Sequence, residues 1–262
     1  MPRLAVLGYP VAHSRSPAMH NAALAALGME GWSYEAIEVA PDAFEQRVLG
    51  MPGGGFAGAN VTVPHKGAAL SVADELSATA REVGAANTLT FTDGEVRADN
   101  TDAEGLLNAL PDSPEGRRAL VLGAGGAARA VVWALVREGA EVEVWNRTQL
   151  RTRHLCEELG GRPVDAPAQA DYELIVNSTA VGLGGEDVFE ELPLSAQGFV
   201  PGQVVVDMVY GDKRAKLLTA AESAGAAVVD GIEVLVQQGA LSLEIWTGCE
   251  PPLDVMRTAA RL

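Results

Sequence analysis

Short apolar runs alternate with helical segments along almost the whole chain, and this alternation limits the folds open to it. Runs typical of buried strands stand at residues 4–7, 32–39, 59–63, 119–122, 142–145, 174–177, 204–207 and 227–229. Segments with a helical pattern lie between them or after them, at residues 17–27, 41–49, 72–83, 103–110, 127–138, 150–159, 213–224 and 234–246. Asp93-Gly94, between residues 88–91 and 96–99, predicts a β-hairpin. Repeated strand–helix alternation favours parallel sheets with covered faces, so we expect an α/β protein.

Two changes in this pattern indicate two domains. A chain of 262 residues has room for one or two. We place a boundary near residues 101–103 and a second crossing near residues 232–238. Residues 1–102 with 236–262 would then form one α/β domain, and residues 103–235 the other. Chains that leave a domain and return usually build a cleft, so we expect a ligand site between the two halves.

The net charge of the chain restricts the kinds of partner that it can bind. Acidic residues outnumber basic ones by 35 to 19, which leaves a net charge of −16. This field repels nucleic acids and anionic lipid surfaces, so an anionic ligand needs a local cluster of donors. The N-terminus lacks the layout of a signal peptide, and the two cysteines and four histidines lack metal-binding spacing. We therefore expect a cytoplasmic protein with no metal site and no membrane span.

A glycine-rich turn follows the run at 119–122 and opens the helical segment at 127–138. It comprises Gly123, Ala124, Gly125, Gly126, Ala127 and Ala128, which fit the pattern G-x-G-x-x-A. The first glycine permits a tight turn, the second lets the backbone approach a pyrophosphate, and the small third position lets helix and strand pack closely. Free N–H groups at the helix start would hold the phosphates. Such turns also occur for packing alone, but the flanking strand and helix favour a dinucleotide site.

The end of the next strand distinguishes between two dinucleotides. NAD-binding proteins place a carboxylate there to bind the ribose 2′-hydroxyl, whereas this chain has Asn146, Arg147 and Thr148. Arg151 and Arg153 lie one turn further on. A guanidinium pairs with a 2′-phosphate, and cations at a helix start oppose the helix dipole unless an anion binds there. The pattern favours NADP over NAD, with a solvated arginine cluster as the alternative.

Residues 60–66 (Asn-Val-Thr-Val-Pro-His-Lys) carry the most informative pattern in the N-terminal part. Asn60 and Thr62 share one face of the strand, and Lys66 follows its carboxyl end, where open α/β sheets bind ligands. A partly desolvated lysine beside a carboxylate can exchange a proton with a carbonyl or carbinol oxygen. The alternative is a lysine solvated at the surface.

Other polar residues stand near expected strand ends. Ser14 and Ser16 precede the first helix and would suit a carboxylate, although either could equally cap that helix. Asn87 begins the hairpin. Asp102 stands where the hairpin meets the next helix and could act as the helix cap, as a partner of Lys66, or as both.

These motifs together resemble the shikimate dehydrogenase family. They comprise Ser14-Arg15-Ser16, residues 60–66, Ala86-Asn87-Thr88, Asn100-Thr101-Asp102, the turn at Gly123, Asn146-Arg147-Thr148, Asn177-Ser178-Thr179, residues 207–210 and Gln238-Gly239-Ala240. The resemblance runs through essentially the whole chain. It implies a substrate-binding sheet domain, a Rossmann-type domain and the reversible reduction of 3-dehydroshikimate to shikimate by NADPH.

The resemblance also implies roles for individual residues. Lys66 and Asp102 would be the catalytic pair. The substrate carboxylate would be held by Ser14, Ser16, Thr62 and Tyr210, and the ring hydroxyls by Asn87, Asp102 and Gln238. The pyrophosphate would lie at Gly123, Ala124, Gly125, Gly126 and Ala127, and the 2′-phosphate at Asn146, Arg147, Thr148 and Arg151. Met208 and Gly231 would line the nicotinamide.

Two alternatives remain open at this point. One is an NAD-using quinate/shikimate dehydrogenase, and the missing carboxylate after residue 144 speaks against it. The other is a catalytically silent NADP-binding sensor, which would be expected to lack Lys66 or Asp102; both residues are present. A homodimer is possible.

Overall fold

The computed structural model describes residues 1–211 and 214–262, which form two compact units. Unit 1 comprises Met1–Gly105 and Leu235–Leu262, and unit 2 comprises Leu106–Val234. The bounds lie within α5 (Asp102–Ala109) and α10 (Gly231–Thr247), within three residues of the expected crossings. Across the described residues, each unit contains one six-stranded sheet.

The sheet of unit 1 is mixed. Its order is β2-β1-β3-β5-β6-β4, and its strands are β1 (Arg3–Gly8), β2 (Ser33–Glu38), β3 (Phe56–Val61), β4 (Glu75–Leu76), β5 (Thr88–Thr92) and β6 (Glu95–Asp99). The strands β1, β2 and β3 are parallel, as the alternation predicts. The hairpin predicted at Asp93-Gly94 runs β5 antiparallel to both β3 and β6, whereas β4 pairs parallel with β6. The expectation of parallel sheets is therefore wrong for β5.

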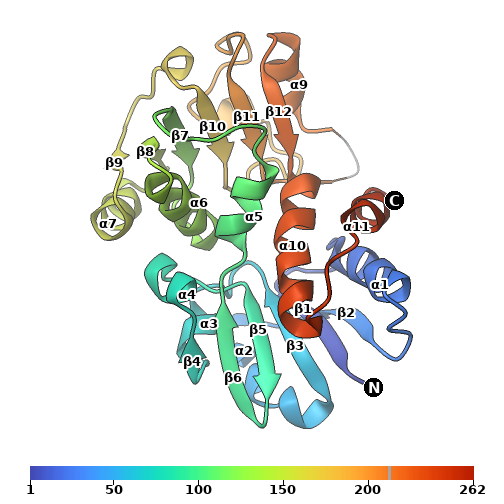
Figure 1. The fold of residues 1–262 in the computed structure, drawn as a ribbon. Coiled ribbons are helices and arrows are strands. Elements are labelled where there is room, and N and C mark those ends of the chain that lie inside the picture. Colours follow the sequence, from blue (N-terminus) through green and yellow to red (C-terminus); the bar gives the residue numbers. More distant parts are fainter. Residues whose placement is uncertain (212–213) are drawn as a thin grey trace. The chain divides into compact units, whose positions relative to one another are not determined.

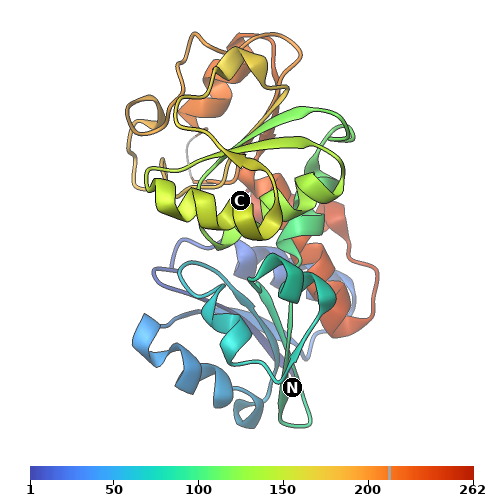
Figure 2. The ribbon, with the colours of Figure 1, turned by 90° about the vertical axis from the view of Figure 1, so that its left-hand side faces the viewer.

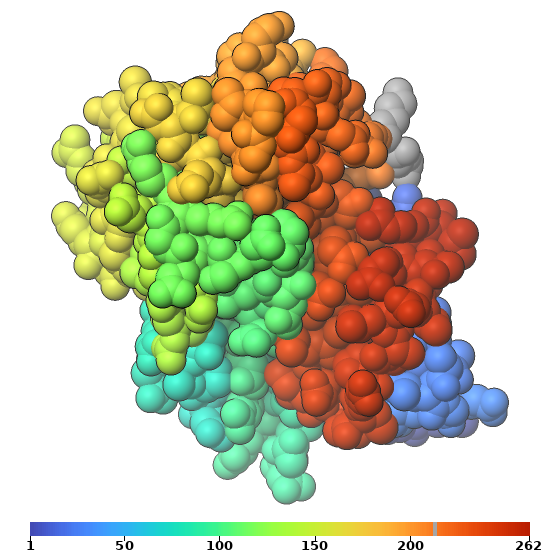
Figure 3. All heavy atoms as spheres, turned by 45° about the horizontal axis from the view of Figure 1, so that its top comes forward, coloured from blue at the N-terminus to red at the C-terminus, as the bar shows by residue number. Residues whose placement is uncertain are grey.

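Helices cover the sheet of unit 1. They are α1 (Ser16–Ala26), α2 (Phe44–Leu49), α3 (Ala68–Ser71), α4 (Ala78–Val83), α11 (Leu253–Ala260) and part of α10, with short 3₁₀ turns at Pro41–Ala43 and Pro52–Gly54. One core cluster contains Ala5 and Leu7 of β1 together with Phe44 of α2. Helix α11 packs against α1, and the two lie side by side in blue and red (Figures 1 and 3).

The helix expected at residues 72–83 is wrong in its first half. Asp74 instead exchanges hydrogen bonds with Val96: its N–H donates to the Val96 carbonyl at 2.8 Å, and its carboxylate accepts the Val96 N–H at 2.9 Å. These bonds begin β4 on the free edge of β6. The hydroxyl of Ser77 then caps α4 by accepting the N–H of Ala80 at 3.1 Å. Short polar side chains that form hydrogen bonds with the backbone compete with the hydrogen bonds of a continuous helix.

The sheet of unit 2 is parallel throughout. Its order is β12-β11-β10-β7-β8-β9, and its strands are β7 (Arg118–Leu122), β8 (Glu141–Trp145), β9 (Arg162–Pro163), β10 (Leu174–Asn177), β11 (Val204–Asp207) and β12 (Ala227–Asp230). Its other elements are α6 (Gly126–Arg137), α7 (Gln149–Leu159), a 3₁₀ turn (Gln169–Asp171), α8 (Val188–Glu191) and α9 (Lys216–Ser223). The expected start of α9 at Lys213 lies outside the described residues.

Strand alternation builds two cores in unit 2. Ala119 and Val121 join the cluster beneath α6 and α7, the helices that cover one face of the sheet (Figure 2). Leu120 and Leu122 point to the opposite face, which α9 covers. A period of two in a strand places neighbouring residues on opposite faces, so these nearly continuous apolar runs fit a sheet buried on both sides. Among the described helices, none is both long and apolar enough to cross a bilayer.

Candidate active site

The chain reverses its direction of winding at the carboxyl ends of β1 and β3. These strands are neighbours, while β2 lies on the other side of β1, which is the arrangement where open sheets bind ligands. The Thr62 N–H donates to the Leu7 carbonyl at 2.8 Å and thereby ties the two strand ends together. Ser14 and Ser16 lie in the segment after β1, where Ser14 accepts the Ser16 N–H at 3.3 Å.

Neither serine takes the expected cap position, because α1 begins at Ser16 itself and Arg15 precedes it. Ser16 is buried and Ser14 is half-buried. In the described part of the chain, no hydrogen bond joins Ser14, Ser16 or Thr62 to the pair formed by Lys66 and Asp102. The two serines follow β1 and Thr62 follows β3, so all three stand at the carboxyl ends of these neighbouring strands.

Lys66 and Asp102 form a buried ion pair. Nζ of Lys66 lies 2.7 Å from Oδ2 of Asp102, and only 12% and 6% of the two side chains are exposed. This rules out the alternative of a solvated lysine. Desolvation largely offsets the attraction in buried pairs, so such a pair contributes little to stability. An ammonium held this way has donors left for a ligand oxygen, because only one of its hydrogens points to Asp102.

Asp102 is free to hold Lys66 because another residue caps the helix. The side-chain oxygen of Asn100 accepts the Ala103 N–H at 3.2 Å, and Asp102 is the first residue of α5. The cap alternative for Asp102 is therefore wrong. The Nδ2 group of Asn100 donates to the Ala85 carbonyl at 2.8 Å, which fixes this junction to the segment before β5.

The backbone around Lys66 is fixed from two directions. The Lys66 carbonyl accepts the Ala86 N–H at 2.9 Å. The neighbouring His65 is buried, stacks on Phe44 with ring centroids 4.5 Å apart, and donates from Nε2 to the Val39 carbonyl at 2.8 Å. A carbonyl oxygen can only accept, so Nε2 carries the hydrogen. The lysine stem therefore leaves a loop that has little freedom to move.

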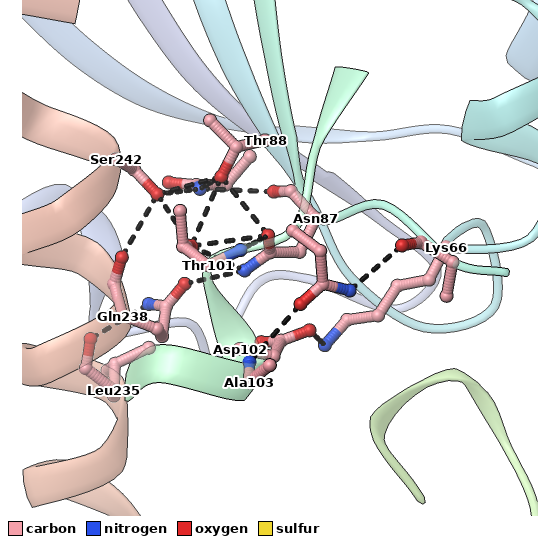
Figure 4. A network of polar contacts seen from close by, with 12 residues as sticks. Lys66, Asn87, Thr88, Thr101, Asp102, Ala103, Leu235, Gln238 and Ser242 are labelled. Atoms are coloured by element: carbon pink, nitrogen blue, oxygen red, sulfur yellow. Dashed lines mark hydrogen bonds and ion pairs between the residues drawn. The ribbon is translucent and has the colours of Figure 1, made fainter. Parts of the chain in front are cut away.

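Asn87 and Gln238 meet beside the ion pair. Nδ2 of Asn87 donates to Oε1 of Gln238 at 3.0 Å and to Oγ1 of Thr101 at 2.9 Å, while its Oδ1 accepts the Thr101 N–H at 2.7 Å (Figure 4). Gln238 lies on α10 and donates from Nε2 to the Leu235 carbonyl at 2.8 Å. The structure thus brings together four residues expected at the substrate: Lys66, Asn87, Asp102 and Gln238 (Figure 4).

Sequence reasoning missed part of this network. Tyr34 donates to Oδ1 of Asn60 at 2.7 Å, and Thr88 and Ser242 lie within hydrogen-bond distance of each other at 2.8 Å. Thr88 and Ser242 are buried. The one available signal was spacing, because Ser242 follows Gln238 by four residues and so shares a helix face with it.

The glycine-rich turn of unit 2 lies at a second switch of winding direction, between β7 and β10. Gly123 has φ +117°, which only glycine adopts readily, and an added Cβ would lie 2.9 Å from the Ser178 hydroxyl. By contrast, nothing lies within 4 Å of a Cβ built on Gly125. Helix α6 starts at Gly126 with no side-chain cap and no acid in its first turn, so its N–H groups are available to an anion. These features fit a pyrophosphate.

The residues after β8 fit a further phosphate. Helix α7 also begins without a side-chain cap or an acid in its first turn. Arg147, Arg151 and Arg153 are exposed, and within residues 1–211 and 214–262 none of them forms an ion pair. Nδ2 of Asn146 donates to the Thr148 carbonyl at 3.1 Å, which shapes the loop between β8 and α7.

Met208 and Gly231 lie against each other in unit 2. A Cβ on Gly231 would meet the Met208 carbonyl oxygen at 2.7 Å. Tyr210, expected at the substrate carboxylate, is half-buried and belongs to unit 2, unlike the other residues expected there. The preceding Asp207 accepts hydrogen bonds from Asn177 Nδ2 at 2.9 Å and the Val209 N–H at 3.1 Å. Burial, the largest influence, raises the pKa of Asp207 to about 6.

Three family models match the chain. The shikimate dehydrogenase substrate-binding domain matches residues 6–89, the shikimate/quinate 5-dehydrogenase model matches residues 106–181, and the shikimate 5′-dehydrogenase C-terminal domain matches residues 231–261. The matches cover both units and include the Lys66 loop, the glycine-rich turn and α10.

Similar proteins span the whole chain. A shikimate dehydrogenase (NADP⁺) from Methanocella arvoryzae is 45% identical, over 98% of this chain and 97% of its own. A crystal structure of shikimate 5-dehydrogenase from Thermus thermophilus, in complex with NADP(H) and shikimate, is 44% identical with a TM-score of 0.91, over 100% and 99% of the two chains. A Listeria monocytogenes shikimate 5-dehydrogenase in complex with shikimate and NAD is 29% identical, with a TM-score of 0.83, over 98% and 96%. The chain therefore belongs to the shikimate dehydrogenase family.

Proposed function

We propose that this chain catalyses the reversible reduction of 3-dehydroshikimate to shikimate with NADPH, a step in aromatic amino-acid biosynthesis. The observation that carries the proposal is the buried ion pair of Lys66 and Asp102 beside the amides of Asn87 and Gln238. A proton donor with hydroxyl-binding groups suits a polyhydroxylated cyclic ketone. Family membership supports the same activity.

Lys66 supplies the proton in this reaction. Reduction of the carbonyl carbon places negative charge on its oxygen, and the proton from Nζ of Lys66 neutralises that charge. Oδ2 of Asp102, at 2.7 Å from Nζ, keeps the ammonium in place and accepts from a ring hydroxyl. In the reverse direction the carbinol proton returns to Nζ.

The other residues near this site bind the ring hydroxyls and the carboxylate of the substrate. Asn87 and Gln238 bind ring hydroxyls, and their mutual hydrogen bond at 3.0 Å exchanges for bonds to those hydroxyls. Ser14, Ser16 and Thr62 hold the substrate carboxylate with hydroxyl and N–H donors at the ends of β1 and β3. The family resemblance assigns Tyr210 to the same carboxylate.

Residues of unit 2 bind the cofactor. When bound, NADPH supplies the hydride, and the protein supplies placement and charge. The N–H groups from Gly123 to Ala127 hold the pyrophosphate. Asn146, Arg147, Thr148 and Arg151 hold the 2′-phosphate, and Met208 and Gly231 line the nicotinamide. Bidentate pairing by a guanidinium favours NADP, because NAD lacks that phosphate.

The test combines two substrates with two cofactors. Shikimate or quinate is added to the purified protein with NADP or NAD, and absorbance of the reduced nicotinamide is followed. We expect the highest kcat/KM for shikimate with NADP. Equal rates with NAD would support the NAD-using quinate/shikimate enzyme instead. NADP binding without turnover of either substrate would support a silent sensor and overturn the proposal.

The proposal extends to the setting of the enzyme. A biosynthetic reduction that consumes NADPH is compatible with the cytoplasmic location that we propose. Sedimentation of the purified chain distinguishes a monomer from a homodimer.

A further inference from the structure

The hydroxyl of Ser242 lies at the centre of the polar network beside the proposed substrate site. Its Oγ is 2.8 Å from Oγ1 of Thr88, 3.1 Å from Oγ1 of Thr101 and 3.1 Å from the Gln238 carbonyl (Figure 4). It is also 2.9 Å from Nδ2 of Asn60. Ser242 is fully buried, one helical turn after Gln238 on α10. It therefore links α10 to β3, to β5 and to the segment before α5.

The chemistry of these neighbours fixes the direction of the bonds. A serine hydroxyl donates one hydrogen and accepts two. The Gln238 carbonyl can only accept, so it receives the hydrogen of Ser242. Nδ2 of Asn60 can only donate, so it occupies one lone pair. The second lone pair is left for one threonine, and Thr88 is the nearer at 2.8 Å.

The direction of the bond between Ser242 and Thr88 also affects which groups donate to Asn87. With Thr88 donating to Ser242, the hydroxyl hydrogen of Thr101 is free for Oδ1 of Asn87 at 3.2 Å. That oxygen already accepts the Thr101 N–H at 2.7 Å. Two donors on Oδ1 require that the amide oxygen face Thr101, so the NH₂ group of Asn87 must face Oε1 of Gln238, at 3.0 Å.

We propose that Ser242 is a positioning residue: by tying α10 to β3 and β5 it holds the Asn87 and Gln238 amides at the spacing that one ring hydroxyl of the substrate requires. The inference rests on the proposed function, because it assigns that hydroxyl to these two amides. A hydroxyl between them accepts from Asn87 Nδ2 and donates to Gln238 Oε1. Without Oγ of Ser242, the Thr88 hydroxyl turns to Oδ1 of Asn87 at 3.2 Å and the bonds that tie α10 to β3 and β5 are lost, so Asn87, still held by the Thr101 N–H, is no longer kept at a fixed spacing from Gln238.

The first comparison uses two variants on the same helix. Ser242→Ala removes the hydroxyl. Thr247→Ala is the matched control, because Oγ1 of Thr247 makes the same type of bond, to the Leu243 carbonyl at 2.7 Å, outside the network. We expect Ser242→Ala to raise the dissociation constant of shikimate roughly tenfold, the loss of about one hydrogen bond. The NADP dissociation constant should change less than twofold, and Thr247→Ala should change neither.

Thr88→Val tests the role of Ser242 independently, through its bond to Thr88. It removes the donor to Ser242 with little change of shape, so it should also weaken shikimate binding. If Ser242 acts through the bond to Thr88, the double variant should weaken binding by less than the product of the single effects. Multiplicative effects would show that the two residues act independently and would overturn the inference.

Deoxy analogues of shikimate separate positioning from a general structural role. Calorimetry gives the affinity of analogues that each lack one ring hydroxyl. For one analogue, the wild type and Ser242→Ala should bind about equally, because the oriented amides have lost their ligand. Equal weakening for shikimate and all analogues would show a structural role only. A wild-type chain that neither binds nor oxidises shikimate would instead refute the proposed function.

Discussion

Replacing His20 tests how burial in unit 1 makes stability depend on pH. His20 lies in α1, is fully buried, and stacks on Tyr34 with ring centroids 4.2 Å apart and an interplanar angle of 8°. Within the described residues, neither ring nitrogen has a hydrogen-bond partner. Burial therefore lowers the pKa of His20 from 6.5 to about 3. His20→Phe keeps an aromatic ring on Tyr34 and removes the titrating group.

The sign follows from proton binding in the two states. The unfolded chain takes up a proton at His20 near pH 6.5, and the folded chain only near pH 3, so stability falls as pH drops between these values. Linkage over these pKa values gives a loss of about 2 kcal/mol in the free energy of unfolding between pH 7 and pH 5. The His20→Phe variant should lack this loss, whatever its stability at pH 7.

Urea unfolding at pH 5, 6 and 7 measures the effect. The matched variant is His154→Gln, which removes an exposed histidine and leaves the buried His20 in place. The wild type should lose about 2 kcal/mol more than His20→Phe from pH 7 to pH 5. Parallel pH curves for the wild type and His20→Phe would refute the reasoning.

Three further predictions address the cofactor site, the substrate site and a buried acid. Arg147→Ala should raise the NADP dissociation constant roughly 10- to 100-fold, which corresponds to the loss of one charge-assisted hydrogen bond, and should leave the NAD dissociation constant unchanged. The control variant Arg153→Ala should leave the NADP dissociation constant unchanged. Equal losses of affinity for both cofactors in Arg147→Ala would contradict the assignment of Arg147 to the 2′-phosphate. Gly105→Ala brings a Cβ to 2.6 Å from the Cβ of Gln238, so it should lower the free energy of unfolding by about 1–3 kcal/mol. Because it displaces Gln238, it should also raise the shikimate KM. An unchanged KM would argue against a role of Gln238 in binding the substrate. Asp207 has a pKa raised to about 6, so the wild type should gain about 1 kcal/mol from its protonation between pH 7 and pH 5. Asp207→Asn should abolish that gain in urea unfolding, and a gain that persists would locate it elsewhere.

Local patterns predicted much of the fold. The apolar runs anticipated the parallel strands of unit 2, and Asp93-Gly94 anticipated the hairpin. The helix expected at residues 72–83 was wrong because the edge of β6 draws Asp74 and the following residues into a strand. That edge is formed by residues about twenty positions later, which a local pattern does not contain.

In the candidate site, too, some features could be predicted from the local sequence and others depend on the fold. The position of Lys66 after β3 was predictable, because ligand sites lie at the carboxyl ends of such strands. Its ion pair with Asp102 could be suggested by family resemblance, but the 2.7 Å contact follows only from the fold. The links from Ser242 to Asn60 and Thr88 join residues more than 150 positions apart, and no spacing along the chain encodes them.

The kinetics of Lys66→Ala test the central claim most directly. If Lys66 transfers the proton, kcat for shikimate oxidation with NADP should fall roughly 10²- to 10⁴-fold, while the shikimate dissociation constant changes much less. Lys216→Ala removes an exposed lysine that pairs with Asp187 and should leave kcat unchanged. An unchanged kcat in Lys66→Ala, with a large rise in KM alone, would contradict the account by showing that Lys66 only binds the substrate.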